Sequence, residues 1–284
     1  MWTAGAAPAR AQAVERVIYA SVLDAAGKPV TEVRIGDVAV REDGVAREVL
    51  RIAPATDPME IALLVDNSAA SANEIVNLRD AIESFTAAVA GTHAVSIVGL
   101  ADRPTLLADT TNDKLALKRG VGRLFTQSNS GMYLLDGIVE AAKGFRKRQA
   151  ARPVIVSVTT DGVEFSNLRH QQVLEALADA GAAYHAIILT RTGSDQSSDE
   201  ARERNMVLDR GTREFGGSRK ELLTGMAVKE AMLALAEQLT KQVKVTFARP
   251  QSLIPPQRTT IESTVPGMTV RGALARIYGA GSAR

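Results

Sequence analysis

The apolar run at residues 61–65, followed at once by Asp66, constrains the fold of this 284-residue chain more than any other segment. Near-continuous apolar residues over this length are typical of a strand buried on both faces of a parallel sheet. Open sheets of this kind place their ligand sites where the strands end. The segment therefore predicts an α/β fold and marks Asp66 as the first candidate site residue.

The chain after this strand alternates between helical and strand patterns. Apolar residues recur at helical spacing over 75–89, 115–124, 134–145, 168–180 and 228–239. Buried-strand patterns occupy 93–100, 153–158 and 184–189, and 216–223 is typical of a short edge strand. This alternation predicts a doubly wound, mostly parallel, Rossmann-like sheet flanked by helices.

Both ends of the chain have β patterns instead. Residues 17–23, 38–41 and 46–52 are strand candidates, and Asp43-Gly44 is typical of the turn in a hairpin. Residues 243–247, 259–264 and 268–278 offer further strands, so we expect the two ends to pair into a small β module. The predicted organisation is a tail at 1–13, a β segment at 14–57, the α/β domain at 58–242, and a second β segment at 243–284 that pairs with the first.

Composition excludes several classes of function. The chain has no cysteine, which excludes disulfides, thiol catalysis and thiolate metal sites. Its formal charge of +2 comes without a dense basic stripe, so we expect no nucleic-acid partner. No apolar run approaches the roughly 20 residues that a membrane span needs, so we expect a chain that does not span a membrane.

The first thirteen residues allow two interpretations. Ala9-Arg10-Ala11 and Ala11-Gln12-Ala13 both have the small-x-small pattern of a signal-peptidase site, but the charged start and apolar stretch that precede such a site are missing. The segment is either the remnant of a signal peptide or a disordered tail. The first interpretation predicts export to the periplasm or the medium, and the second a cytoplasmic protein.

Three loops carry the candidate site residues, and a doubly wound sheet would bring all three to its carboxyl edge. The first follows the strand at 61–65, the second opens the helix at 134–145, and the third follows the strand at 153–158. The residues of interest are Asp66, Asn67, Ser68 and Ser71 in the first loop, Ser130, Met132 and Tyr133 in the second, and Asp161 and Glu164 in the third.

The order and spacing of these motifs resemble the von Willebrand factor type A (VWA) family. That family carries Asp-x-Ser-x-Ser after its first strand, a Thr in a second loop and an Asp, often as Asp-Gly, after a later strand. Asp66 and Ser68 match the first motif and Asp161 the last, whereas Ala70 replaces the second Ser and Met132 the Thr. The flanking β segments are similar to those of bacterial VWA-related proteins common in acidobacteria.

The resemblance implies a metal-ion-dependent adhesion site, but two of its ligands are replaced. Mg²⁺ prefers about six oxygen ligands, Ala70 supplies none, and the thioether of Met132 is a poor partner for a hard cation. We therefore expect a degenerate site of Asp66, Ser68 and Asp161, with no cofactor or with weakly bound Mg²⁺ or Mn²⁺. Ser71 would add an oxygen only if the loop shifted by one residue, and its simpler role is to cap a helix starting near residue 72.

The resemblance implies a non-enzymatic interaction or adhesion domain that binds a protein partner at the carboxyl edge of the sheet. The expected partner-contacting residues are Asn67, Ser71, Ser130, Met132, Tyr133 and Glu164. We expect Met132 and Tyr133 to offer an apolar contact at the mouth of the site.

Two alternatives remain. One is a metal-dependent hydrolase such as a phosphoesterase, which needs a third ligand near Asp66 and Asp161, and Glu164 is the closest candidate in the sequence. The other is a structural domain whose site has decayed. The three histidines are expected to be structural or exposed rather than catalytic.

Overall fold

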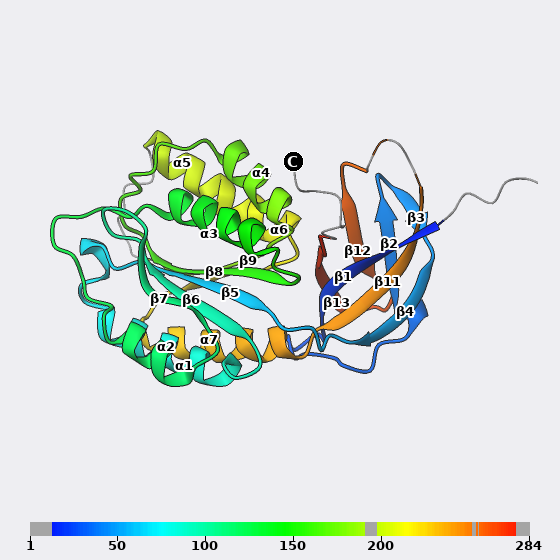
Figure 1. Ribbon diagram of the computed structural model, residues 1–284, viewed down its shortest axis with the longest axis horizontal. Helices are drawn as coiled ribbons and strands as arrows, with labels where there is room; N and C mark the ends of the chain where they lie inside the picture. Colours follow the sequence, from blue (N-terminus) through cyan, green and yellow to red (C-terminus); the bar gives the residue numbers. More distant parts are fainter. Residues whose placement is uncertain (1–12, 191–197, 252–253, 255, 277–284) are drawn as a thin grey trace, which may run out of the picture.

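The computed structural model describes residues 13–190, 198–251, 254 and 256–276, so the predicted tail or signal-peptide remnant at residues 1–13 lies outside the described part except for Ala13, which begins a strand. The chain forms an α/β domain and a β module that lie side by side (Figure 1). None of the helices that the structure describes has both the length and the apolar character to cross a membrane.

A six-stranded sheet forms the centre of the α/β domain. Its order is β10-β9-β8-β5-β6-β7, and every neighbouring pair is parallel except β6 with the edge strand β7. The strands are β5 (Glu60–Val65), β6 (Ala94–Gly99), β7 (Thr105–Thr111), β8 (Pro153–Thr160), β9 (Ala183–Leu189) and β10 (Arg219–Leu222). The predicted fold class is confirmed, including the short edge strand β10.

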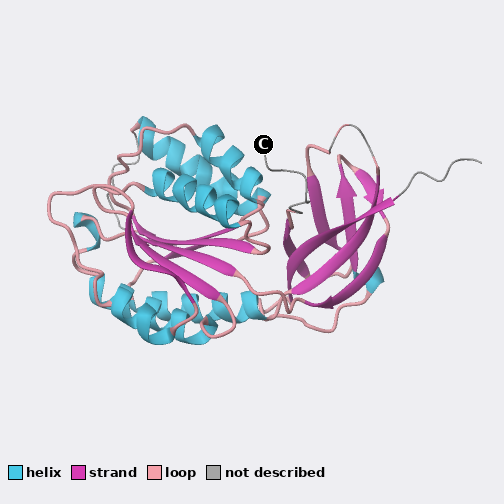
Figure 2. Cartoon of the chain, in the orientation of Figure 1, coloured by secondary structure: helices cyan, strands magenta, loops and turns pink. Residues whose placement is uncertain are grey.

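Helices cover both faces of this sheet (Figure 2). One face carries α1 (Ile75–Val89), α2 (Lys114–Val121) and α7 (Met226–Thr240). The other carries α3 (Leu134–Arg148), α4 (His170–Ala180), α5 (Asp199–Met206), the π-helix η3 (Val207–Gly211) and the single turn α6 (Thr212–Glu214). The two layers leave the central strands with no solvent-exposed face, which explains their continuous apolar sequences.

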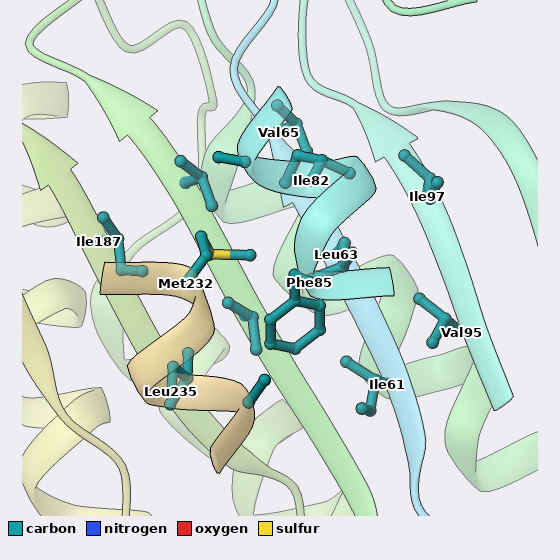
Figure 3. Packing of buried hydrophobic residues seen from close by; sticks show 14 of the residues in the cluster. Ile61, Leu63, Val65, Ile82, Phe85, Val95, Ile97, Ile187, Met232 and Leu235 are labelled. Atoms are coloured by element: carbon teal, nitrogen blue, oxygen red, sulfur yellow. The ribbon is translucent and has the colours of Figure 1, made fainter. Parts of the chain in front are cut away.

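Successive side chains of β5 enter different cores because side chains alternate along a strand. Ile61, Leu63 and Val65 pack with Phe85 of α1 and with residues of α7, as Figure 3 shows. The intervening residues of β5 pack against α3 and α4 on the opposite face. Burial of both faces therefore anchors the strand on which the candidate site is built.

The two ends of the chain pair to form the β module. One sheet has the order β13-β1-β11-β4, with β1 (Ala13–Leu23), β4 (Val49–Pro54), β11 (Val243–Pro250) and β13 (Thr269–Leu274). The second is β12-β2-β3, with β2 (Val38–Glu42), β3 (Val45–Arg47) and β12 (Thr259–Ser263), preceded by a 3₁₀ turn η1 (Ile35–Asp37). Apolar residues of both sheets form a third core between them.

The predicted single strand at residues 46–52 is wrong, because the chain changes sheets within it. Residues 45–47 pair with β2, whereas β4 pairs with β11 next to an irregularity between Thr246 and Phe247. The carbonyl of Glu48 accepts a hydrogen bond from the N–H of Ala248 at this crossing. The alternating pattern continues through both strands, so it gives no signal of the break.

Arg152 fastens the start of β8 to the segments that lead into the β module. Its guanidinium is almost fully buried and lies 4.9 Å from the centre of the Tyr19 ring. It donates to the carbonyls of Ala55 (3.2 Å), Asp57 (2.9 Å) and Leu239 (2.9 Å) and to Oε1 of Gln242 (2.7 Å). Burial lowers the pKa of Arg152 to about 10, so the side chain stays charged at neutral pH.

Candidate functional site

Three loops meet at the carboxyl edge of the sheet. The N–H of Ala69 donates to the carbonyl of Ser130 (3.4 Å), which joins the first loop to the second. The N–H of Met132 donates to the carbonyl of Val163 (2.8 Å), which joins the second loop to the third. The structure thus brings together the three segments that the sequence places at this edge, and Asp66 lies where β5 enters them.

The carboxylate of Asp66 is fully buried and both of its oxygens accept hydrogen bonds. Oδ1 accepts from the N–H of Ser68 (2.9 Å), and Oδ2 accepts from the N–H of Thr160 (3.1 Å) and from the Thr160 hydroxyl. Hydrogen bonds to an ionised carboxylate are stronger than neutral ones and stabilise its charge. The N–H and O–H donors of Ser68 and Thr160 therefore stabilise the negative charge of Asp66, as a bound cation would otherwise do.

Ser68 and Ala70 lie against the start of the third loop. A Cβ atom added to Gly162 would lie 2.8 Å from the Cβ of Ala70 and 3.4 Å from Oγ of Ser68. The Ser68 hydroxyl is buried and has no hydrogen-bond partner among the described residues. Gly162 therefore packs closely against the methyl group of Ala70 and the hydroxyl of Ser68.

These residues do not fit a divalent-cation site. Mg²⁺ requires near-octahedral coordination by about six oxygens. Both oxygens of Asp66 are engaged, Ala70 offers no oxygen, and Ser68 contributes one at most. Across the described residues, no group of three or more His, Cys, Asp or Glu side chains is placed to hold a metal ion. Asp161, the remaining predicted ligand, is partly exposed, and its N–H donates to the carbonyl of Leu189 (3.2 Å).

Glu164 is buried and faces the start of α3 rather than a partner. Its Oε1 accepts from the N–H groups of Leu134 (3.2 Å) and Ser166 (3.1 Å), while Oε2 has no partner among the described residues. Burial raises the pKa of Glu164 to about 7, against the lowering effect of its hydrogen bonds to Ser166 and of the charge of Arg204. Its role as a partner-contacting residue is therefore not supported by its position, and it satisfies an N–H group of the first turn of a helix.

Arg204 is a buried charge that sequence reasoning missed. It comes from α5, and its Nη1 donates to the carbonyl of Gly162 (2.6 Å) beneath the third loop. The helix that carries it is too rich in charged residues to show an apolar face, so periodicity gave no signal for α5.

The predicted apolar contact of Met132 at the mouth of the site is wrong, because its side chain is fully buried in the core that packs against α3 and α4. The exposed apolar groups belong instead to Val163 (62% exposed) and Phe165 (50% exposed). The Phe165 ring covers Gly131 so closely that an added Cβ would lie 2.4 Å from it, and it packs edge-to-face on the Tyr133 ring at 6.1 Å. We call Tyr133, Val163 and Phe165 the apolar rim.

A sequence signal for this rim exists. Val163 and Phe165 flank Glu164 in the alternating pattern of an extended segment, so burial of the acid implies exposure of its neighbours.

The other predicted contact residues act inside the loops. Asn67 is buried, accepts from the N–H of Ala101 (2.9 Å) and donates to the carbonyl of Phe125 (3.0 Å). Ser71 lies in a 3₁₀ turn, η2 (Ala69–Ser71), and its hydroxyl donates to the carbonyl of Ser68 (2.8 Å).

The predicted N-cap role of Ser71 is wrong, because α1 begins at Ile75. The partly buried Ser130 donates to the carbonyl of Gln127 (2.8 Å). These side chains brace the loops rather than face a partner.

The histidines have structural partners. The Nδ1 atom of His93 accepts from the N–H of Met59 (3.2 Å), His170 pairs with Glu203 (2.7 Å), and His185 contacts the hydroxyl of Ser218 (3.1 Å).

The residues from β5 to the third loop have a sequence relationship that matches this geometry. The sequence model of the von Willebrand factor type A domain matches residues 61–164, which include the three loops. The chain carries a VWA domain. The VWA fold is commonly used for protein–protein interaction and adhesion. Comparison with curated proteins finds no significant match.

Two solved structures illustrate what the chain is similar to, and the first supports the VWA fold. A von Willebrand factor type A protein from Catenulispora acidiphila is similar with a TM-score of 0.51 over 94% of this chain and 74% of that chain, at 9% identity. The vWF domain of the type V pili tip protein Mfa5 from Porphyromonas gingivalis has a TM-score of 0.49, 10% identity, and coverage of 65% of this chain and 96% of that chain. At these identities the similarity concerns the fold alone.

Proposed function

We propose that this protein is a non-enzymatic binding domain that contacts a protein partner through the apolar rim of its VWA domain without a bound cation. The observation that carries the proposal is the state of Asp66. Its carboxylate is buried, and both of its oxygens accept hydrogen bonds from Ser68 and Thr160, which stabilise its charge without a cation. The expected export of the protein stays a prediction.

The apolar rim supplies what a protein partner would recognise. Val163 and Phe165 are large and exposed, and they lie on either side of the buried Glu164 along the third loop. Aromatic and aliphatic anchors that become buried on association provide most of the affinity in many interfaces. Phe165 is also held in place by Tyr133 and by the glycine beneath it, which reduces the entropy that it would lose on binding.

The hydrolase alternative lacks the third ligand that it needs at this edge of the sheet. It requires Glu164 to join Asp66 and Asp161, but Glu164 accepts hydrogen bonds from the backbone at the start of α3. The other alternative is a purely structural domain. Every observation that fits it is also explained by the binding proposal.

The test uses capture of partners from an extract of the source organism on immobilised protein. A double variant, Val163→Asp with Phe165→Asp, places charge on the apolar rim. The matched control is Leu115→Asp on α2. The side chain of Leu115 is 68% exposed. It lies near the amino edge of the sheet, since the nearby Asn112 accepts a hydrogen bond from Gly91 in the loop before β6. We expect specific capture by the wild type and the control, both with EDTA and with Mg²⁺, and its loss in the rim variant.

Capture that requires Mg²⁺, or that survives in the rim variant, would contradict the proposal. Thermal melting gives a second measurement, because a cation at 100 times its dissociation constant would add about 2.7 kcal/mol to the free energy of unfolding. We expect no shift in the melting temperature with Mg²⁺ or Mn²⁺ relative to EDTA.

A further inference from the structure

Glu164 and the apolar rim belong to one short extended segment. Glu164 is only 2% exposed, whereas its neighbours Val163 and Phe165 face solvent. Successive side chains of an extended segment point to opposite sides, so the inward position of Glu164 fixes the outward position of both neighbours. The N–H of Met132 donates to the carbonyl of Val163 (2.8 Å), and the N–H of Phe165 donates to the carbonyl of Met132 (2.8 Å). Because Glu164 lies between these two hydrogen bonds, exposing its carboxyl group to water would break them and displace the rim.

The carboxyl group of Glu164 has partners for only one of its oxygens. Oε1 accepts from the N–H groups of Leu134 (3.2 Å) and Ser166 (3.1 Å), whereas Oε2 is buried and has no partner among the described residues. A charged group is costly to bury unless it is fully paired, and the neutral acid costs much less. This arrangement therefore favours the protonated form, in contrast to Asp66, which has donors at both oxygens.

One positive charge acts on Glu164, and it also belongs to a residue that holds the third loop. Arg204 of α5 is buried, and its Nη1 donates to the carbonyl of Gly162 (2.6 Å) rather than to the carboxyl group. Burial raises the pKa of Glu164 to about 7, and the hydrogen bonds to Ser166 and the charge of Arg204 oppose this rise only in part.

Tyr184 is the titratable group that β9 presents to this site. The charges of both Glu164 and Arg204 act on it, so the three side chains lie within electrostatic reach of one another. Burial raises the pKa of Tyr184, and its hydroxyl is hydrogen-bonded to that of Ser157 (2.9 Å). Tyr184 therefore stays neutral near pH 7 and does not compensate the charge of Glu164.

The helices around the third loop bring no second base that acts on Glu164. Asp136, in the first turn of α3, is a further acid, and its N–H donates to the hydroxyl of Ser166 (3.2 Å). On α4, His170 is paired with Glu203 of α5 (2.7 Å). Ionisation of Glu164 therefore leaves a buried charge that the described part of the site offsets only weakly.

We propose that Glu164 is a proton-dependent switch for the apolar rim: the protonated side chain keeps the third loop closed with Val163 and Phe165 facing outward, and loss of the proton opens the loop and weakens partner binding. The inference rests on the proposed function, because it concerns the regulation of that same surface.

The pH range of the switch follows from the two states of Glu164. In an open loop its pKa returns toward 4.5, whereas the closed loop keeps it at about 7. The closed loop therefore has its full stability below pH 4.5, loses it as the pH rises to about 7, and loses no more above that pH. Between pH 5 and pH 7.5 the equilibrium constant for opening should rise about thirtyfold to a hundredfold.

The test measures hydrogen exchange by NMR on the full chain at pH 5 and pH 7.5. The amides of Met132 and Phe165 report on the loop, because their hydrogen bonds close it. The reference is the amide of Ala248 in the β module, which donates to the carbonyl of Glu48 (2.9 Å). Comparison with this amide cancels the intrinsic dependence of exchange on pH and reveals any opening of the whole molecule.

Two glutamate variants separate the switch from a general charge effect. Glu164→Gln keeps a neutral side chain of the same length at every pH. The matched control is Glu140→Gln on α3, because Glu140 is exposed and forms no ion pair with a described residue. We expect the protection of Met132 and Phe165, relative to Ala248, to fall about thirtyfold to a hundredfold in the wild type and in Glu140→Gln. It should stay constant in Glu164→Gln.

Protection that does not change with pH in the wild type, that changes equally in Glu164→Gln, or that falls equally at Ala248 would overturn the switch. Partner capture on immobilised protein gives the second measurement. We expect the wild type to capture less at pH 7.5 than at pH 5, and Glu164→Gln to capture equally at both. Equal capture by the wild type at both pH values, with loss in the rim variant, would overturn the switch and leave the proposed function intact. Capture that survives in the rim variant at both pH values would contradict the proposed function, and the exchange measurement would still decide whether the loop opens with pH.

Discussion

Replacing Thr160 by Val tests whether the buried carboxylate of Asp66 is held by the protein itself. Valine has nearly the same shape as threonine but removes the hydroxyl that donates to Oδ2 of Asp66. Hydrogen bonds to charged groups contribute about 1.5–3 kcal/mol, and a buried acceptor that loses its partner keeps its desolvation cost. The N–H of Thr160 remains as a donor, so we expect a loss of about 2–3 kcal/mol in the free energy of unfolding.

The assay is urea unfolding followed by far-UV circular dichroism, with the free energy obtained by linear extrapolation. Thr159→Val is the matched control, because Thr159 is its neighbour on β8, is equally buried, and makes no side-chain hydrogen bond with a described residue. The control should differ from the wild type by less than about 1 kcal/mol. If Thr160→Val costs no more than Thr159→Val, the hydroxyl does not stabilise Asp66, and the argument against a cation loses its basis.

Two further predictions concern buried charges. Arg152→Met should cost about 3–5 kcal/mol, because three buried acceptors and one partly buried acceptor lose their donor, whereas Arg148→Met, which removes a partly exposed ion pair with Glu60, should cost about 1 kcal/mol or less in the same urea assay. Burial raises the pKa of Glu164 from 4.5 to about 7, so the unfolded chain releases this proton first. The corresponding stability is complete below pH 4.5 and is lost as the pH rises to about 7, by about 3 kcal/mol in total. Glu164→Gln should lack this component of the pH dependence, and an unchanged profile would contradict the assigned burial effect.

Local patterns predicted the α/β domain well where each segment carries its own signal. The apolar runs of β5 and β8 predicted central strands because the two helical layers bury both of their faces. The same reasoning missed α5, whose residues are mostly charged and whose contacts are made by few side chains such as Arg204. It also joined β3 and β4, because their alternation is continuous across the crossing at Glu48.

The candidate site was predictable in its location but not in its chemistry. The order of Asp66, Ser68 and Asp161 along the chain placed the loops at one edge of the sheet. Thr160 was not singled out, since it is the last residue of a buried strand and has no motif of its own. Its contact with Asp66 depends on the parallel pairing of β5 with β8, in which Val65 lies opposite Val158. The prediction that Met132 faces outward was wrong. The sequence alone does not specify which way the side chain of a loop residue points.

Sequence alone determined that strands and helices alternate, that β strands occupy the segments on both sides of the α/β domain, and that an acid follows a central strand, because each of these depends on neighbours a few residues apart. Only the tertiary structure decided what that acid binds, since the hydroxyl of Thr160 is 94 residues away and reaches Asp66 through the register of the sheet. The same holds for the close approach of Gly216 to the backbone of Gly272, because the two residues are far apart in the sequence.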